Sequence, residues 1–187
     1  AIIAELNEWL EAGLIRPSTS HYNSPIFCVD KKDGSLRPVL DYRDVNENSL
    51  DDKYSGREIK DCIDELGRAG SKIFSTIDLT SGFWQMKLNE NSRPYTAFTI
   101  PGIGSYEWCV CPMGLKGLPA SFGRLTTFVV RGTPTIMYQD DGLNHSKTHD
   151  QHLIDLQIMF NRFRGHNLKL NLKKCHFGQT NIEYLGF

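Results

Sequence analysis

The sequence lacks a long hydrophobic run, an excess of charge of either sign and an even set of cysteines. Its 187 residues carry 21 basic and 22 acidic side chains, for a formal net charge of −1. This balance provides no global attraction to nucleic acid, so any basic surface has to be local. No apolar stretch reaches the ~20 residues of a membrane helix, and we expect no bilayer span. Five scattered cysteines argue against a secreted disulfide framework and favour a reducing compartment.

The residues that are present suit a folded α+β protein. Hydrophobic residues make up 40% of the chain and charged residues 23%, as in ordinary globular domains. Helical periodicity predicts helices over 2–10, 59–67, 119–129 and 148–163. Strand patterns occur at 25–29, 36–40, 73–79, 95–100, 106–111, 135–138, 168–172 and 182–187. A loop is expected over 46–56. Hairpin signals, such as Asp33-Gly34, outnumber regular strand-helix-strand alternation, which favours α+β over a doubly wound sheet.

Three aspartates form the candidate catalytic set. Asp78 closes an apolar strand, and Asp140 and Asp141 follow the strand at 135–138. Carboxylates gathered at strand ends repel one another unless a cation lies among them. Their hard oxygens suit Mg²⁺, and two such ions can clamp a phosphoryl displacement. An Asp-Asp pair alone is more often a solvated turn, so the neighbouring motifs decide the interpretation.

Those motifs resemble the reverse transcriptases. Tyr138-Gln139-Asp140-Asp141 is similar to the Tyr-x-Asp-Asp signature of that family. The segments that resemble its other motifs, in order, are 36–43, 74–85, 112–122, 167–169, 174–177 and 184–186. The set covers essentially the whole chain and most resembles the polymerases of gypsy-type LTR retrotransposons.

The resemblance implies a right-hand polymerase fold with fingers and palm. The fingers would occupy mainly 1–76 and the palm mainly 77–187, with a fingers insertion around 90–112; the thumb is expected to be absent. Asp78, Asp140 and Asp141 would be the catalytic residues. They would hold two Mg²⁺ ions, replaceable by Mn²⁺, with help from the Leu79 carbonyl.

The resemblance also implies contacts with the incoming nucleotide. Arg37 and Lys32 would lie on the triphosphate, since an Arg fork suits phosphate oxygens. Phe83 would exclude a 2′-hydroxyl and so select deoxynucleotides, and Met113 would pack near the sugar. For Lys32 an ordinary soluble turn is an equally good interpretation, and without the motif Phe83 reads as a core residue.

Nucleic-acid contacts are implied for a further set, namely Tyr138, Gly114, Lys116, Leu185 and Gly186. The partners would be an RNA or DNA template with its primer, deoxynucleoside triphosphates, and the thumb, RNase H and integrase domains of a polyprotein. No membrane partner is expected, and the family implies particles in the cytoplasm with a product destined for the nucleus. For Lys169, Lys173 and Lys174 a solvated face is favoured over phosphate contact. Zinc binding by His149 and His152 is disfavoured.

Several residues near the aspartates depart from the family pattern. Gln139, Gly142 and Asn144 stand where apolar residues are usual. Loss of apolar area should loosen the hairpin, and restoring it at Gly142 and Asn144 should raise the melting temperature. Two functions follow: a working reverse transcriptase core, or a decayed or repurposed palm that binds nucleic acid or protein without catalysis.

Overall fold

The computed structural model describes residues 2–30, 34, 36–54 and 56–187. The chain divides into two compact units, each assembled from two stretches of sequence. Unit 1 comprises Ala1–Asp51 and Phe83–Leu118, and unit 2 comprises Asp52–Gly82 and Pro119–Phe187. These boundaries come from packing alone. The expected functional boundaries at 76 and around 90–112 therefore stay a prediction.

Unit 1 is built around a cluster of aromatic rings. Its sheets are antiparallel, with strand orders β1-β6-β5 and β2-β3. Trp9 of α1 packs on Trp108 of β6 with ring centroids 4.9 Å apart, and Leu6, Ile15, Phe98 and Ile100 complete the buried cluster. The elements are α1 (Ile2–Glu11), β1 (Ile15–Pro17), β2 (Ile26–Asp30), β3 (Leu36–Leu40), α2 (Arg43–Glu47), η2 (Glu90–Thr96), β5 (Phe98–Ile100) and β6 (Gly104–Trp108).

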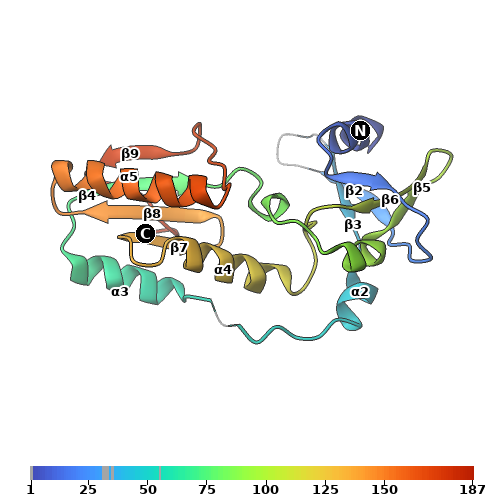
Figure 1. Ribbon diagram of the computed structural model, residues 1–187, viewed down its shortest axis with the longest axis horizontal. Coiled ribbons are helices and arrows are strands. Elements are labelled where there is room, and N and C mark those ends of the chain that lie inside the picture. The colour runs from blue at the N-terminus through green and yellow to red at the C-terminus, as the bar shows by residue number, and fades with distance from the viewer. Residues whose placement is uncertain (1, 31–33, 35, 55) are drawn as a thin grey trace. The chain divides into compact units, whose positions relative to one another are not determined.

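Unit 2 is a four-stranded antiparallel sheet with helices packed on it. The strand order is β7-β8-β4-β9, so β4 is an inner strand. Helix α5 packs on β8 and β4, as Figure 1 shows. A second buried cluster joins Cys62 of α3 to Ile136, Leu143 and Tyr184. The elements are α3 (Ile59–Ala69), β4 (Ile73–Asp78), β7 (Thr135–Tyr138), β8 (Asp141–Ser146), α5 (His149–Gly165) and β9 (His176–Gln179). Helix α4 (Leu118–Val129) and the 3₁₀ turn η1 (Gly82–Gln85) span the unit boundaries.

Four expectations about secondary structure need correction. The predicted loop at 46–56 begins inside helix α2. Helix α3 continues through Gly67 and ends at Gly70, which adopts the left-handed conformation of a C-terminal cap. Residues 168–172 form no strand but contribute one isolated bridge, Leu79 to Leu170. The last strand is β9, and residues 182–187 form no strand, with a turn at 185–186.

Candidate active site

The register of unit 2 brings the three aspartates to one end of the sheet. Asp78, the last residue of β4, lies directly opposite Asp141, the first residue of β8. Strands β7 and β8 are joined by a two-residue turn, Gln139-Asp140, closed by the Tyr138–Asp141 pair. The backbone N–H of Leu79 donates to the carbonyl of Asp140 over 3.2 Å and ties the turn to the end of β4.

Close packing shapes this turn. Gln139 adopts a φ of +56°, which L residues with a long side chain rarely do. Gly82 follows the end of β4, and its neighbours leave no room for a side chain at this position. A Cβ there would lie 2.8 Å from Cζ of Phe122 and 3.3 Å from Cβ of Asp140. The turn that carries Asp140 therefore depends on a glycine at position 82.

Desolvation and charge repulsion both act on the carboxyl of Asp141. Partial burial raises the pKa of its carboxyl, and the neighbouring carboxylates of Asp140 and Asp78 raise it further. The ammonium of Lys174 opposes this shift of the Asp141 pKa. A group of like charges with one lysine nearby is a site where added positive charge is favourable.

Residues 169–175 form a segment that holds the end of β4. The N–H of Asn171 donates to the carbonyl of Asp78 over 2.9 Å, and the N–H of Thr80 donates to the carbonyl of Lys169 over 3.0 Å. The N–H of Asp78 donates to Sγ of Cys175 over 3.4 Å. These contacts place Lys174 beside Asp78, where its Nζ donates to Oδ2 over 3.3 Å. Sequence reasoning missed this ion pair, because it favoured a solvated lysine.

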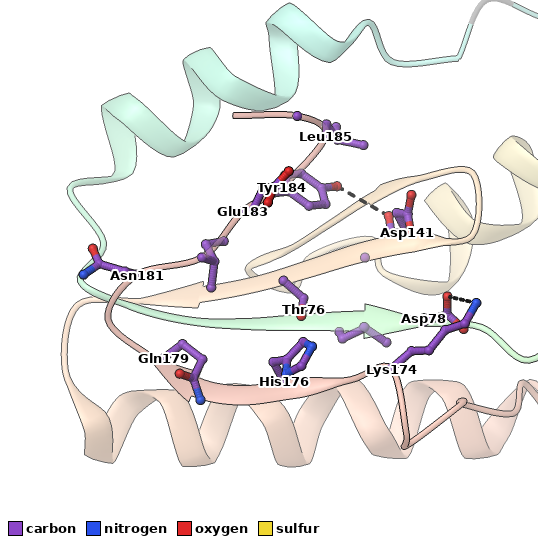
Figure 2. Close-up of a pocket in the computed structure, with 14 residues that line it drawn as sticks. Thr76, Asp78, Asp141, Lys174, His176, Gln179, Asn181, Glu183, Tyr184 and Leu185 are labelled. Atoms are coloured by element: carbon purple, nitrogen blue, oxygen red, sulfur yellow. Dashed lines mark hydrogen bonds and ion pairs between the residues drawn. The ribbon is translucent and has the colours of Figure 1, made fainter.

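A cavity of about 590 Å³ opens beside Asp78 and Asp141. Figure 2 shows Tyr184 on its wall, with its hydroxyl directed at the backbone of Asp141. That hydroxyl donates to the Asp141 carbonyl over 3.4 Å, and burial raises the pKa of the phenol, which keeps it a donor. Leu185 and Gly186 also line the cavity. Unit 2 thus gathers the three aspartates with Leu79, Tyr138, Leu185 and Gly186.

The other site residues expected from sequence belong to unit 1. Arg37 is exposed on β3, Phe83 is half-buried in η1, and Met113 is exposed in the loop before α4. Lys32 lies outside the described residues, as do Lys31 and Asp33. The nucleotide-contact roles of Arg37, Lys32, Phe83 and Met113 stay predictions.

Gly114 and Lys116 are held by the helix that sequence reasoning missed. The side-chain amide of Asn46 donates to the carbonyl of Gly114 and accepts from the N–H of Lys116, each over 2.8 Å. The ammonium of Lys116 forms an ion pair with Asp51. Gly114 itself has a φ of +100°, so the loop needs glycine there. No short sequence signal links Asn46 to a loop about 70 residues away.

A buried polar network under the sheet also went unpredicted. His152 of α5 has Nε2 2.6 Å from the hydroxyl of Ser75 and Nδ1 3.0 Å from that of Ser146. Ser146 donates to Asp155 over 2.6 Å. The network suits a neutral imidazole that donates to Ser146 and accepts from Ser75, and burial lowers the His152 pKa accordingly. The sequence disfavours zinc binding by His149 and His152, and among the described residues no three His, Cys, Asp or Glu side chains form a metal-binding group.

Comparison with known proteins identifies the family. The model of the family described as reverse transcriptase (RNA-dependent DNA polymerase) matches residues 29–187. The chain therefore belongs to the reverse transcriptases. Its relatives include the Pol polyproteins of the Drosophila melanogaster transposons opus, 38% identical over 98% of this chain, and gypsy, 35% identical over 98%. The enzymatic polyprotein of cauliflower mosaic virus (strain D/H) is 37% identical over 97%.

Solved structures agree on the α+β fingers and palm fold. The foamy viral protease-reverse transcriptase in complex with double-stranded DNA matches 100% of this chain and 39% of its own, with a TM-score of 0.86 and 30% identity. The same enzyme in complex with an RNA/DNA hybrid matches 97% and 24%, with a TM-score of 0.85 and 30% identity. The chain spans 19% of the opus polyprotein, 18% of the gypsy polyprotein and 27% of the viral one. Within the described residues, no helix is both long and apolar enough to cross a bilayer.

The family implies dependence on a divalent metal, and the donor chemistry of the site fits one. Asp78 and Asp141 lie opposite one another on β4 and β8, and Asp140 lies in the turn between β7 and β8. Their mutual repulsion, which adds to desolvation in raising the pKa of Asp141, would be relieved by a cation that prefers hard oxygen ligands. In the described residues the three side chains do not themselves close around one point. Water and substrate oxygens would have to complete the coordination.

Proposed function

We propose that this chain is the fingers and palm core of an RNA-directed DNA polymerase. It would add deoxynucleotides to a primer on an RNA or DNA template. The proposal is carried by the pairing of Asp78 with Asp141 and the adjoining Asp140 turn, in a chain of the reverse transcriptase family. In this assignment the fingers occupy mainly 1–76, with an insertion around 90–112, and the palm occupies mainly 77–187. The thumb, RNase H and integrase domains would belong to a longer polyprotein, with particles in the cytoplasm and a product destined for the nucleus.

The three aspartates would hold two Mg²⁺ ions, with Mn²⁺ as a substitute and the Leu79 carbonyl as a further donor. Bound ions would stabilise the negative charge that develops on the transferred phosphoryl group and on the leaving pyrophosphate. Among the protein's own residues, Tyr184 braces the backbone of Asp141. Tyr138, Gly114, Lys116, Leu185 and Gly186 would contact nucleic acid. Arg37 and Lys32 would bind the triphosphate, Met113 would pack against the sugar, and Phe83 would exclude the 2′-hydroxyl.

The test is primer extension by the purified chain on an RNA template with Mg²⁺ and deoxynucleotides. Asp140→Asn is the control, because it keeps the shape of the turn and removes a carboxylate. We expect extension by the parent chain and its loss in the variant. Extension that survives in Asp140→Asn would contradict the assignment of the catalytic residues.

A second candidate is a palm that binds nucleic acid or a protein partner without catalysis. It is favoured by the lack of three converging metal ligands among the described residues and by the ion pair that occupies Asp78. Binding of a primer-template that is independent of Mg²⁺, together with no extension, would support it over the first.

A further inference from the structure

The position of Lys174 gives it a role in the acidic site, and this inference rests on the proposed metal-binding function. We infer that Lys174 is the resident counter-cation of Asp78, which stabilises the acidic strand ends before metal binds and which an incoming divalent ion has to displace. Lys174 would be a positioning residue for the metal rather than a catalytic one.

The backbone around Lys174 supports this role, because it is fixed to the strand that carries Asp78. Asn171 bonds the carbonyl of Asp78, and Cys175 accepts from its N–H. Between them, the N–H of Lys174 donates to the carbonyl of Asn171 over 2.9 Å and closes a turn. Most exposed lysines sample many positions, but this one projects from a turn anchored on both sides of its partner.

The ion pair between Asp78 and Lys174 affects metal binding, because only one of the two side chains is free to move. The Asp78 side chain is 17% exposed and that of Lys174 66%, so the carboxylate is fixed while the ammonium can leave towards solvent. Among the described residues, the only ion pair made by the three aspartates is that between Asp78 and Lys174. Figure 2 shows the two side chains meeting at the edge of the cavity that also holds Asp141. A divalent ion bound to Asp78 would face the positive charge of Lys174 unless that side chain moved away.

This arrangement predicts opposite effects on stability and on metal affinity. Removing the charge of Lys174 leaves the repelling carboxylates without a counter-ion, which lowers the stability of the metal-free chain. The same change removes the competitor, so a divalent ion binds more tightly. For a partly exposed ion pair the expected gain in affinity is about two- to fivefold.

The experiment uses the whole 187-residue chain and Mn²⁺ as the probe, with free Mn²⁺ followed by electron paramagnetic resonance. Five proteins are compared: the parent, Lys174→Met, Lys174→Arg, Lys173→Met and Asp78→Asn. Lys173 is the matched control because it is exposed on the same turn and forms no ion pair with the described residues. We expect tighter Mn²⁺ binding and a lower metal-free melting temperature in Lys174→Met alone, with Lys174→Arg close to the parent.

The outcomes separate this inference from the proposed function. If the parent binds Mn²⁺ in a way that Asp78→Asn abolishes, while Lys174→Met binds no more tightly, the counter-cation role is wrong and the metal site stands. If the parent binds no Mn²⁺, both are overturned. Equal gains in Mn²⁺ affinity in Lys174→Met and Lys173→Met would attribute the effect to the net charge of the chain and also overturn the inference.

Discussion

At the scale of single residues, Gln139 carries the strain of the hairpin that holds Asp140 and Asp141. Its φ of +56° and the unpaired buried Oε1 of its side chain are both unfavourable. A left-handed conformation costs a non-glycine residue about 1–2 kcal/mol, and glycine avoids this cost. Glycine also raises the conformational entropy of the unfolded chain, which cancels part of the stabilisation. We expect Gln139→Gly to stabilise the chain by about 0.5–1 kcal/mol, a rise of roughly 1–4 °C in melting temperature. Gln139→Ala keeps the φ penalty, so an equal gain there would assign the strain to the side chain instead.

Neighbouring side chains occupy the space where an apolar side chain at position 142 would lie. A Cβ at position 142 would lie 2.6 Å from Sδ of Met137 and 3.3 Å from Cβ of Ile77, so the space is already filled. An apolar residue here would have to displace the Met137 side chain, and this close packing argues against the expected stabilisation. Asn144 is also fully buried, and its side-chain amide donates to Thr135 over 2.8 Å.

We expect Gly142→Ala to destabilise the chain by about 1–3 kcal/mol in chemical denaturation, through overpacking against Met137. Gly67→Ala is the matched control, because Gly67 lies inside α3 with open space around its Cα. That change should stabilise by about 0.5–1 kcal/mol, since glycine weakens a helix interior. A neutral or stabilising Gly142→Ala would show that Met137 moves aside at little cost.

At the scale of elements, local patterns predicted most helices and strands but not the contacts between distant ones. Thr148 caps α5 by accepting from the N–H of Gln151, and the strand at 135–138 is β7 as expected. The alternating leucines at 168–172 predicted a strand wrongly. The segment is held to the end of β4 by isolated hydrogen bonds and one bridge rather than by a strand ladder. The three aspartates could be predicted from the resemblance. Lys174 could not, since its partner is 96 residues away.

The packing of α5 on the sheet should be sensitive to acid through His152. Its folded pKa is lowered by burial, so the folded chain binds fewer protons than the unfolded chain below the ordinary histidine pKa of about 6.5. Stability should be fully present above that pH and be lost as the pH falls below it. Melting temperatures from pH 7.5 to 5.5 should drop less steeply in His152→Gln than in the parent, although the variant starts lower. His149→Gln, at an exposed position of the same helix, should keep the parent slope, and a flattened slope there would contradict the assignment.

At the scale of the whole molecule, the site trades stability for metal binding. Desolvation and the neighbouring carboxylates raise the pKa of Asp141, so its ionised form is unfavourable in the folded chain. We expect Asp141→Asn to raise the melting temperature in the presence of a chelator. Ten millimolar Mg²⁺ acting with a dissociation constant near 1 mM would stabilise the parent by about 1.4 kcal/mol. The variant should lose most of that stabilisation. An undiminished effect of Mg²⁺ on the melting temperature would show that Asp141 does not contribute to binding the ion.

The inner position of β4 also has a consequence in time. Both of its sheet partners, β8 and β9, are made after it, and the stretch 83–118 that intervenes before β8 belongs to the other unit. During synthesis both edges of β4 therefore stay unpaired until residues beyond 140 have emerged from the ribosome. Such long-range pairing is slow and leaves strand edges open to aggregation. The acidic site is thus completed only after β8 has emerged, which makes it sensitive to the rate of translation and to chaperones that shield unpaired strands.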